Sequence, residues 1–354
     1  MHKFKQIILY IFIICIGFSS SSLARNAGNG WLELTIESTK LRKEAKYTES
    51  LKIAEETLQL AIENADSTDD DILISINNLA SLYDSLAQYD KAETLYTRAL
   101  KILEKKVGSN NLLIAKLLNN IATHYNFLGK YSDAQNYYED SLKIRENYSG
   151  KESTDVAIVL NNLAEIYTIE EQYSKAENFY KRSLLILEKK LGMYHPKLEP
   201  ILTNLASLYS SQGKNKMAEE LCTRALGILE KEFGDESLGI ARILGLQARI
   251  YEKKKKYVIA EKLYNRSVKI LENFLGKNHP NVAITLSNFA VFYINKNELN
   301  KALKLLNRSV KILKNKLGSN HSETIKISKI LMYLNRDIAS KKNSNQVSDS
   351  NKSK

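Results

Sequence analysis

The sequence repeats itself every 42 residues, and this period constrains the fold more than any other feature. From about Ile76 to Gly318 the repeat runs without an insertion, and four of its columns are invariant in six copies. The columns are Ala80, Ala122, Ala164, Ala206, Ala248 and Ala290; Ala92, Ala134, Ala176, Ala218, Ala260 and Ala302; Tyr83, Tyr125, Tyr167, Tyr209, Tyr251 and Tyr293; and Gly108, Gly150, Gly192, Gly234, Gly276 and Gly318. Such a period is typical of solenoids, in which each unit packs on its neighbours.

Each copy encodes two amphipathic helices. Apolar residues of the first fall at offsets of 0, 3, 4 and 7, which is one face of a helix; they are Ile76, Leu79, Ala80 and Tyr83. The second helix has a similar stripe from Ala92 to Leu103. We predict a capping box at Asp90–Glu93, and a left-handed glycine at Gly108 that ends the helix. Only 3 prolines and 14 glycines in 354 residues also favour long helices.

Several segments match a known family nearly residue for residue. They are Asn161–Tyr167, Gln172–Glu177, Phe179–Ser183, Leu187–Gly192 and His195–Pro196. These segments resemble tetratricopeptide repeats of the 42-residue variety found in kinesin light chains. The resemblance implies an all-α, right-handed superhelical solenoid of antiparallel helix pairs that binds a peptide or protein. Attachment to kinesin is not implied, because the coiled-coil heptads of that family are absent.

The pattern divides the chain into five segments. We predict a signal peptide at 1–24, a linker and degenerate N-terminal capping repeat at 25–71, and six 42-residue units at 72–318. A C-terminal capping helix at 319–340 and a disordered polar tail at 341–354 follow. We therefore expect about seven helix pairs and one terminal helix, without strands.

The N-terminus has the features of a secretory signal. Lys3 and Lys5 precede an apolar run from Ile7 to Phe18, and small residues occupy Ser22 and Ala24. The run of 12 residues is short for a membrane span. We expect export, with cleavage after Ala24 leaving no stable membrane span and a periplasmic, secreted or cell-surface protein. The alternative is an uncleaved N-terminal segment that anchors the protein in a membrane.

The residues that carry chemistry in other proteins are sparse. His195, His279 and His321 occupy one repeated loop position, and equivalent positions in stacked repeats lie too far apart to share a metal ion. No phosphate-binding loop, nucleophile elbow or zinc-binding helix motif is present. Cys222 falls in a column of buried tyrosines, so we expect an inert core residue. We predict no enzyme activity, no cofactor and no metal site.

The concave face of the first helices is the candidate binding surface. In the resembling family this groove is lined by residues displaced from the buried stripe, and in this chain those columns begin at Ile74, Asn77, Ser81 and Asp84. The predicted peptide-binding residues are Asn77, Lys116, Asn119, Asn126, Asn161, Arg242 and Arg249. Amides carry both a donor and an acceptor, so an asparagine ladder can hold the main chain of an extended peptide. Abundant surface asparagine is the alternative explanation, and we expect the adjacent Asn78 column to be structural.

The fifth copy departs from the pattern. Leu246 replaces an asparagine, Gln247 replaces an apolar residue, and Arg242 and Arg249 lie seven residues apart on one helix face. Either this copy has drifted or it is a specialised binding segment. Guanidinium groups there would hold carboxylates, which predicts an acidic peptide with a large apolar anchor.

Two functions remain after catalysis is set aside. The first is an exported scaffold that binds a peptide or protein in its groove. The second is a basic envelope- or surface-associated protein that binds acidic polymers or membrane headgroups by charge, as the net charge of +12 allows. We expect no nucleic-acid partner, because a base-reading code is absent from the repeats.

Overall fold

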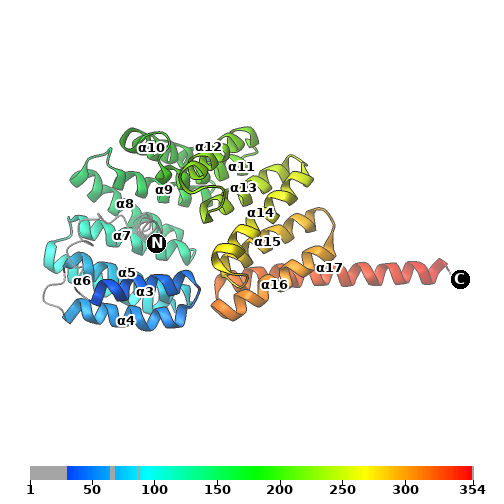
Figure 1. Ribbon diagram of the computed structural model, residues 1–354, viewed down its shortest axis with the longest axis horizontal. Coiled ribbons are helices and arrows are strands. Elements are labelled where there is room, and N and C mark those ends of the chain that lie inside the picture. The colour runs from blue at the N-terminus through cyan, green and yellow to red at the C-terminus, as the bar shows by residue number, and fades with distance from the viewer. Residues whose placement is uncertain (1–29, 64–67, 87, 353–354) are drawn as a thin grey trace. The chain divides into compact units, whose positions relative to one another are not determined.

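The structure is a computed structural model that describes residues 30–63, 68–86 and 88–352 (Figure 1). The described chain folds into 15 α-helices and one short 3-10 helix, Pro196–Leu198, without a strand. None of the described helices is both long enough and apolar enough to cross a bilayer. The predicted signal peptide, residues 1–24, lies outside the described residues.

The helices form seven successive pairs and one terminal helix. The pairs are α3 (Gly30–Lys43) with α4 (Tyr47–Glu63), α5 (Asp69–Ser85) with α6 (Tyr89–Val107), α7 (Leu112–Phe127) with α8 (Tyr131–Ser149), α9 (Thr154–Ile169) with α10 (Tyr173–Leu191), α11 (Glu199–Ser211) with α12 (Asn215–Phe233), α13 (Leu238–Lys253) with α14 (Tyr257–Leu275), and α15 (Pro280–Asn295) with α16 (Leu299–Leu317). The terminal helix is α17 (Ser322–Lys352). The predicted all-α class and the seven pairs with a terminal helix are confirmed.

The chain divides into two compact units, Met1–Glu232 and Phe233–Lys354. Unit 1 contains α3 to α11 and all of α12 except its last residue. Unit 2 contains α13 to α17. Within each unit the helix pairs follow one another in chain order, as Figure 1 shows.

The two alanine columns are completely buried. Every alanine in both columns, from Ala80 to Ala302, has no exposed surface. A methyl group lets two helix backbones approach closely, whereas a larger side chain at such a site would force strain. Complete burial is what the sequence assignment of these columns to the helix contacts requires.

Repeated hydrogen bonds hold four of the pairs together and join neighbouring pairs. Within the four pairs, a serine on the second helix donates to a backbone carbonyl of the first, as in Ser141 to Ala115 and Ser183 to Ala157, both at 2.6 Å. Between pairs, the tyrosine column donates to glutamates of the preceding second helix, as in Tyr125 to Glu93 at 2.6 Å. The tyrosines are thus packing groups that also tie neighbouring pairs.

The turn inside each pair differs from the predicted capping box. α6 begins at Tyr89, one residue before Asp90, and its N-cap Gln88 makes no side-chain capping bond. The first helix instead ends in a tight left-handed turn. In the six pairs where this position is described, its residue has a positive φ, 73° at Gly129 for example. The next amide bonds back to the carbonyl five residues earlier, as in Lys130 to Tyr125 at 2.9 Å.

The glycine column ends each second helix, as predicted, but in a different conformation. Gly192 has φ 90° and ψ 159°, so its backbone is extended with a positive φ rather than left-handed helical. This region of backbone space is essentially restricted to glycine. The invariance of the column follows from this conformation.

The repeated loop histidines cap the next first helix. His195 Nδ1 accepts from the amide of Lys197 at 3.1 Å, and His279 and His321 accept in the same way. The same position is Asn111, Ser153 and Ser237 in other pairs, and each of these side chains also accepts an N-terminal amide. The histidines therefore have a local structural role that the sequence analysis did not assign.

α17 extends further than the predicted capping helix. The sequence placed a helix at 319–340 and a disordered tail at 341–354, whereas the described helix continues to Lys352. No glycine or proline follows Gly318, so no residue in this segment forces the helix to end.

The histidine caps should make stability depend on pH. Burial and the charge of Lys197 lower the pKa of His195, and burial lowers that of His321. Because the unfolded histidine binds a proton at higher pH than the folded one, this stability is complete above about pH 6.5 and is lost as pH falls below it. His195→Ser keeps a capping oxygen that does not titrate. Between pH 7.5 and pH 5 we expect the free energy of unfolding in urea to fall by about 1 kcal/mol less in this variant than in the wild type. Equal losses in the two proteins would contradict this role.

Candidate peptide-binding face

The predicted site residues fall in both units. Asn77 lies on α5, Lys116, Asn119 and Asn126 on α7, and Asn161 on α9, all in unit 1. Arg242 and Arg249 lie on α13 in unit 2. The structure links Asn119 and Asn161 through shared hydrogen bonds.

Five asparagine side chains form a continuous ladder across α7, α9 and α11. Asn204 Nδ2 donates to Asn161 Oδ1 at 3.2 Å, and Asn162 Nδ2 donates to Asn119 Oδ1 at 3.1 Å. Within each helix, a bond of 3.4 Å joins two adjacent asparagines: Asn161 Nδ2 donates to Asn162 Oδ1, and Asn119 Nδ2 donates to Asn120 Oδ1. The ladder therefore connects three successive pairs through side chains alone.

The ladder unites two columns that the sequence analysis separated. Asn120, Asn162 and Asn204 were expected to be structural, and Asn119 and Asn161 to contact a ligand. The contacts show that Asn119 and Asn161 also support the neighbouring helices. A primary amide has two donor hydrogens and two acceptor positions, so each of these two residues keeps one donor and one acceptor for a further partner. Both are half-buried, which leaves that remaining capacity accessible.

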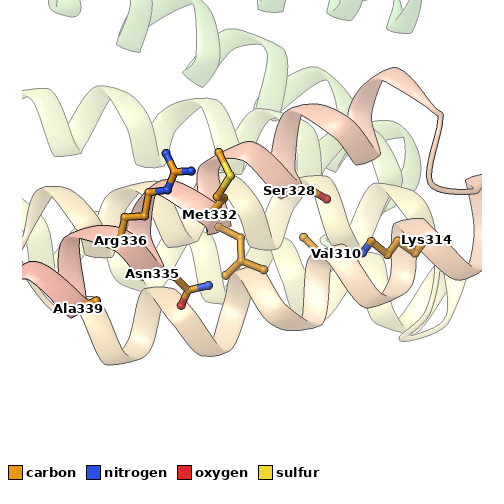
Figure 2. Close-up of a pocket in the computed structure, with 8 residues that line it drawn as sticks. Val310, Lys314, Ser328, Met332, Asn335, Arg336 and Ala339 are labelled. Atoms are coloured by element: carbon orange, nitrogen blue, oxygen red, sulfur yellow. The ribbon is translucent and has the colours of Figure 1, made fainter.

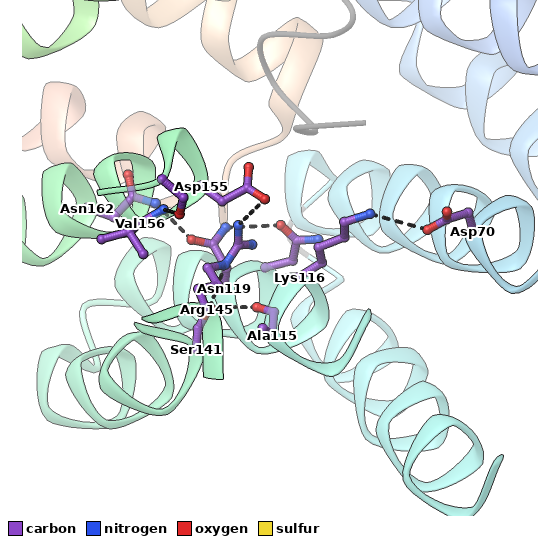
Figure 3. A network of polar contacts seen from close by, with 11 residues as sticks. Asp70, Ala115, Lys116, Asn119, Ser141, Arg145, Asp155, Val156 and Asn162 are labelled. Carbon is purple, nitrogen blue, oxygen red and sulfur yellow. Dashed lines mark hydrogen bonds and ion pairs between the residues drawn. The ribbon is translucent and has the colours of Figure 1, made fainter. Parts of the chain in front are cut away.

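The other predicted residues of unit 1 do not belong to the ladder. Asn77 is only 8% exposed, and its amide has no hydrogen-bond partner. Lys116 forms an ion pair with Asp70 at 3.4 Å, which offsets part of its charge (Figure 3). Asn126 is half-buried near the end of α7. Asn119 and Asn161 are thus the predicted amides with the best placement for a ligand.

The fifth copy lacks the side chains that would continue such a ladder. Gly245 and Leu246 occupy the two asparagine columns, and Leu246 is buried. Arg242 and Arg249 are exposed on the same helix. Burial lowers the pKa of Lys253, and the charge of Arg249 lowers it further. This face of α13 is therefore positively charged.

A buried arginine was missed by the sequence analysis. Arg145 occupies a column that is otherwise leucine, at Leu103, Leu187, Leu229, Leu271 and Leu313. It is 6% exposed, its Nε donates to Ser141 Oγ at 3.2 Å, and its Nη1 lies 3.7 Å from Asp155 Oδ2 (Figure 3). Burial lowers the pKa of Arg145. The sequence signal that could have revealed this residue is the arginine that interrupts an otherwise constant leucine column.

A buried histidine and aspartate pair was also missed. His124 replaces an apolar residue in a core column, is 2% exposed, and lies 2.7 Å from Asp84 through Nδ1. Its Nε2 is buried and has no hydrogen-bond partner. A histidine–aspartate contact also occurs in catalytic triads, but this imidazole is sealed from solvent and cannot reach a substrate without local opening.

The remaining candidate groups have structural settings. Cys222 has no exposed surface, and burial raises the pKa of its thiol to about 12, as expected for an inert core residue. Among the described residues, no group of three or more histidine, cysteine, aspartate or glutamate side chains is arranged to hold a metal ion.

Comparisons with known proteins agree with this architecture. The tetratricopeptide repeat family matches residues 41–105, 113–189, 198–273 and 248–315, which together make up most of the chain. The chain belongs to the tetratricopeptide repeat family, and the resemblance stated from the sequence is confirmed. No curated protein sequence matches the chain.

Three solved structures illustrate the range of proteins with this fold. BtubC (BKLC) from P. vanneervenii is 24% identical, with a TM-score of 0.52 over 66% of this chain and 92% of that one. The Rap conjugation gene regulator of the plasmid pLS20, in complex with the Phr* peptide, is 13% identical, with a TM-score of 0.62 over 83% and 76%. Aspartyl phosphate phosphatase F from Bacillus subtilis is 14% identical, with a TM-score of 0.61 over 81% and 71%. These similarities establish the fold alone, which serves scaffolds and at least one enzyme.

The ladder should contribute measurably to stability. Asn161→Ala removes the acceptor of Asn204 and the donor to Asn162, leaving both half-buried amides short of a partner. We expect a loss of about 1 to 3 kcal/mol in the free energy of unfolding. Asn136→Ala makes the same change at an exposed position of α8 and should alter it by about 0.5 kcal/mol or less. Similar values for both variants in denaturant titrations would show that the ladder carries no net stability.

Proposed function

We propose that this protein is an exported, non-enzymatic scaffold that binds an extended peptide or a peptide segment of another protein. The observation that carries the proposal is the amide ladder on α7, α9 and α11. Its members Asn119 and Asn161 each keep a donor and an acceptor, at equivalent positions of successive repeats. An extended main chain offers alternating carbonyl and amide groups that suit such a surface.

The family and one solved neighbour support a peptide ligand. Tetratricopeptide repeats stack into extended surfaces that are suited to binding. The Rap regulator, which has the same fold, was solved with the Phr* peptide. A peptide ligand also requires no catalytic group, in keeping with the sealed position of His124.

We propose further that the ligand is acidic and carries a large apolar residue. The exposed Arg242 and Arg249 on α13 can form paired hydrogen bonds with carboxylates. The half-buried Ile284 and the exposed Val291, at the corresponding positions of α15, supply apolar surface in the same unit. The overall positive charge would attract such a ligand over distance.

Peptide selection tests the binding function. Full-length protein should enrich acidic peptides from a displayed library. The double change Asn119→Ala/Asn161→Ala should weaken each selected peptide roughly tenfold without altering its sequence preference, because main-chain bonds of about 0.5 to 1.5 kcal/mol are lost. Asn162→Ala disturbs the same ladder but leaves both proposed ligand-binding amides in place. The affinity of this variant for the selected peptides should therefore change less.

A second comparison tests the acidic preference. Arg242→Ala/Arg249→Ala should abolish enrichment of acidic peptides, whereas Lys262→Ala/Lys269→Ala removes the same charge from α14 and should retain it. Equal loss in both double variants would favour binding by overall charge. In that case affinity should also fall steeply, by about a thousandfold for six or more phosphate-like contacts, between about 50 and 200 mM salt.

Export is tested separately. When the full-length chain is produced in a secretion-competent host, the mature protein should begin at Arg25. Replacing Ala24 by leucine removes the small residue that cleavage requires and should block processing. A chain that keeps its N-terminus and stays in the membrane fraction would instead support the uncleaved anchor.

A further inference from the structure

An open groove lies between α16 and α17 in unit 2. Its volume is about 460 Å³, and its apolar floor includes Val310, Leu331 and Met332. Lys314 and Arg336 line its rim. Figure 2 shows Val310 and Lys314 on one helix and Met332, Asn335 and Arg336 on the other.

The repeat register explains why this groove exists. Leu331 and Met332 of α17 correspond to Phe289 and Ala290 of α15, which are 4% and 0% exposed beneath the second helix of their own pair. In α17 the equivalent Met332 is 41% exposed. The described part of the chain supplies no second helix here, because α17 continues to Lys352. The groove therefore corresponds to the position that a second helix occupies in the internal pairs, and we call it the helix seat.

The charge at this seat is opposite to that in the other repeats. The internal second helices from α6 to α14 carry a glutamate in one column. In three cases an arginine of the next second helix binds it: Glu146 with Arg182, Glu188 with Arg224 and Glu272 with Arg308, all at 2.6 Å. In α16 this glutamate position is Lys314. A helix in the seat would need an acidic residue where the internal helices have arginine.

The rest of α16 strengthens this preference. Its sequence has no acidic residue, and its basic residues are Lys301, Lys304, Arg308, Lys311, Lys314 and Lys316. Methionine in place of the alanine also changes the floor, because its flexible side chain suits a helix that is not one of the close-packed repeats.

We propose that the α16–α17 groove binds an acidic amphipathic helix of another protein, with a carboxylate opposite Lys314. A second copy of this chain would bring two basic α16 helices towards each other, which charge repulsion opposes. This surface is separate from the amide ladder, so it provides a second binding site in addition to the proposed peptide face.

A pair of matched peptides provides the test. Both are 19-residue amphipathic helices with the apolar positions of α10 and acidic exposed positions, and they differ only where α10 has Arg182: one carries glutamate and the other arginine. Fluorescence anisotropy with the full-length protein should show that the glutamate peptide binds about fivefold more tightly.

Charge reversal in the protein should reverse the preference. Lys314→Glu should favour the arginine peptide, whereas Lys311→Glu, which makes the same charge change at another exposed position of α16, should still favour the glutamate peptide. Met332→Asp should weaken both peptides, with circular dichroism confirming that the variant remains folded. These results together would support the site.

Other results would overturn the proposal. No binding of either peptide to the wild type would exclude the seat, and the same response to Lys314→Glu and Lys311→Glu would indicate attraction by overall charge. Sedimentation that shows a wild-type dimer disrupted by Met332→Asp would identify a second copy as the occupant.

Discussion

The close contact between helices at the alanine columns is the constraint on which the rest of the structure depends. Six of the seven pairs, from α5–α6 to α15–α16, have one alanine of each column with no exposed surface, and such small side chains let two backbones approach closely. In the α7–α8 pair Ser141 also donates to the Ala115 carbonyl, and Tyr125 donates to Glu93 of the preceding pair. The polar bonds repeat because the apolar contact repeats. A larger side chain at the crossing would displace both kinds of bond together.

Because each pair contacts mainly its neighbours, a change in one column stays local. Arg145 can occupy a leucine position and His124 an apolar one without disturbing the period, since nearby polar groups, Asp155 and Asp84, compensate each of them. The invariant columns therefore describe the scaffold, and the exceptions show where the scaffold has been modified. The ladder on α7, α9 and α11 and its absence at Gly245 and Leu246 follow the same principle.

The sequence predicted the fold well because its signals are periodic. Helix pairs, alanine contacts, the buried Cys222 and the glycine that ends each second helix all follow from one repeated pattern. The predicted capping box at Asp90 was wrong, because the turn before it is closed by the Gln88 amide, which donates to the Tyr83 carbonyl at 2.8 Å, rather than by a polar side-chain cap. The capping role of His195 was missed because histidine is less common there than serine or asparagine, although Ser153 and Ser237 stand in the same column. Hydrogen bonds between repeats, such as the one from Asn162 to Asn119, could not be predicted. They depend on the distance between two helices, which the residue pattern of a single helix does not give.

A periodic array also creates a special problem at its end. In three internal repeats a glutamate of one second helix pairs with an arginine of the next second helix, so these ion pairs are completed by the following repeat. The last helix has no such successor in the described chain, and a glutamate there would keep a charge that attracts another repeat and promotes open-ended association. Lys314 removes that attraction and replaces it with a preference for the opposite charge. The same residue thus makes the α16–α17 groove suited to an acidic helix rather than to a helix that carries the arginine of the internal repeats.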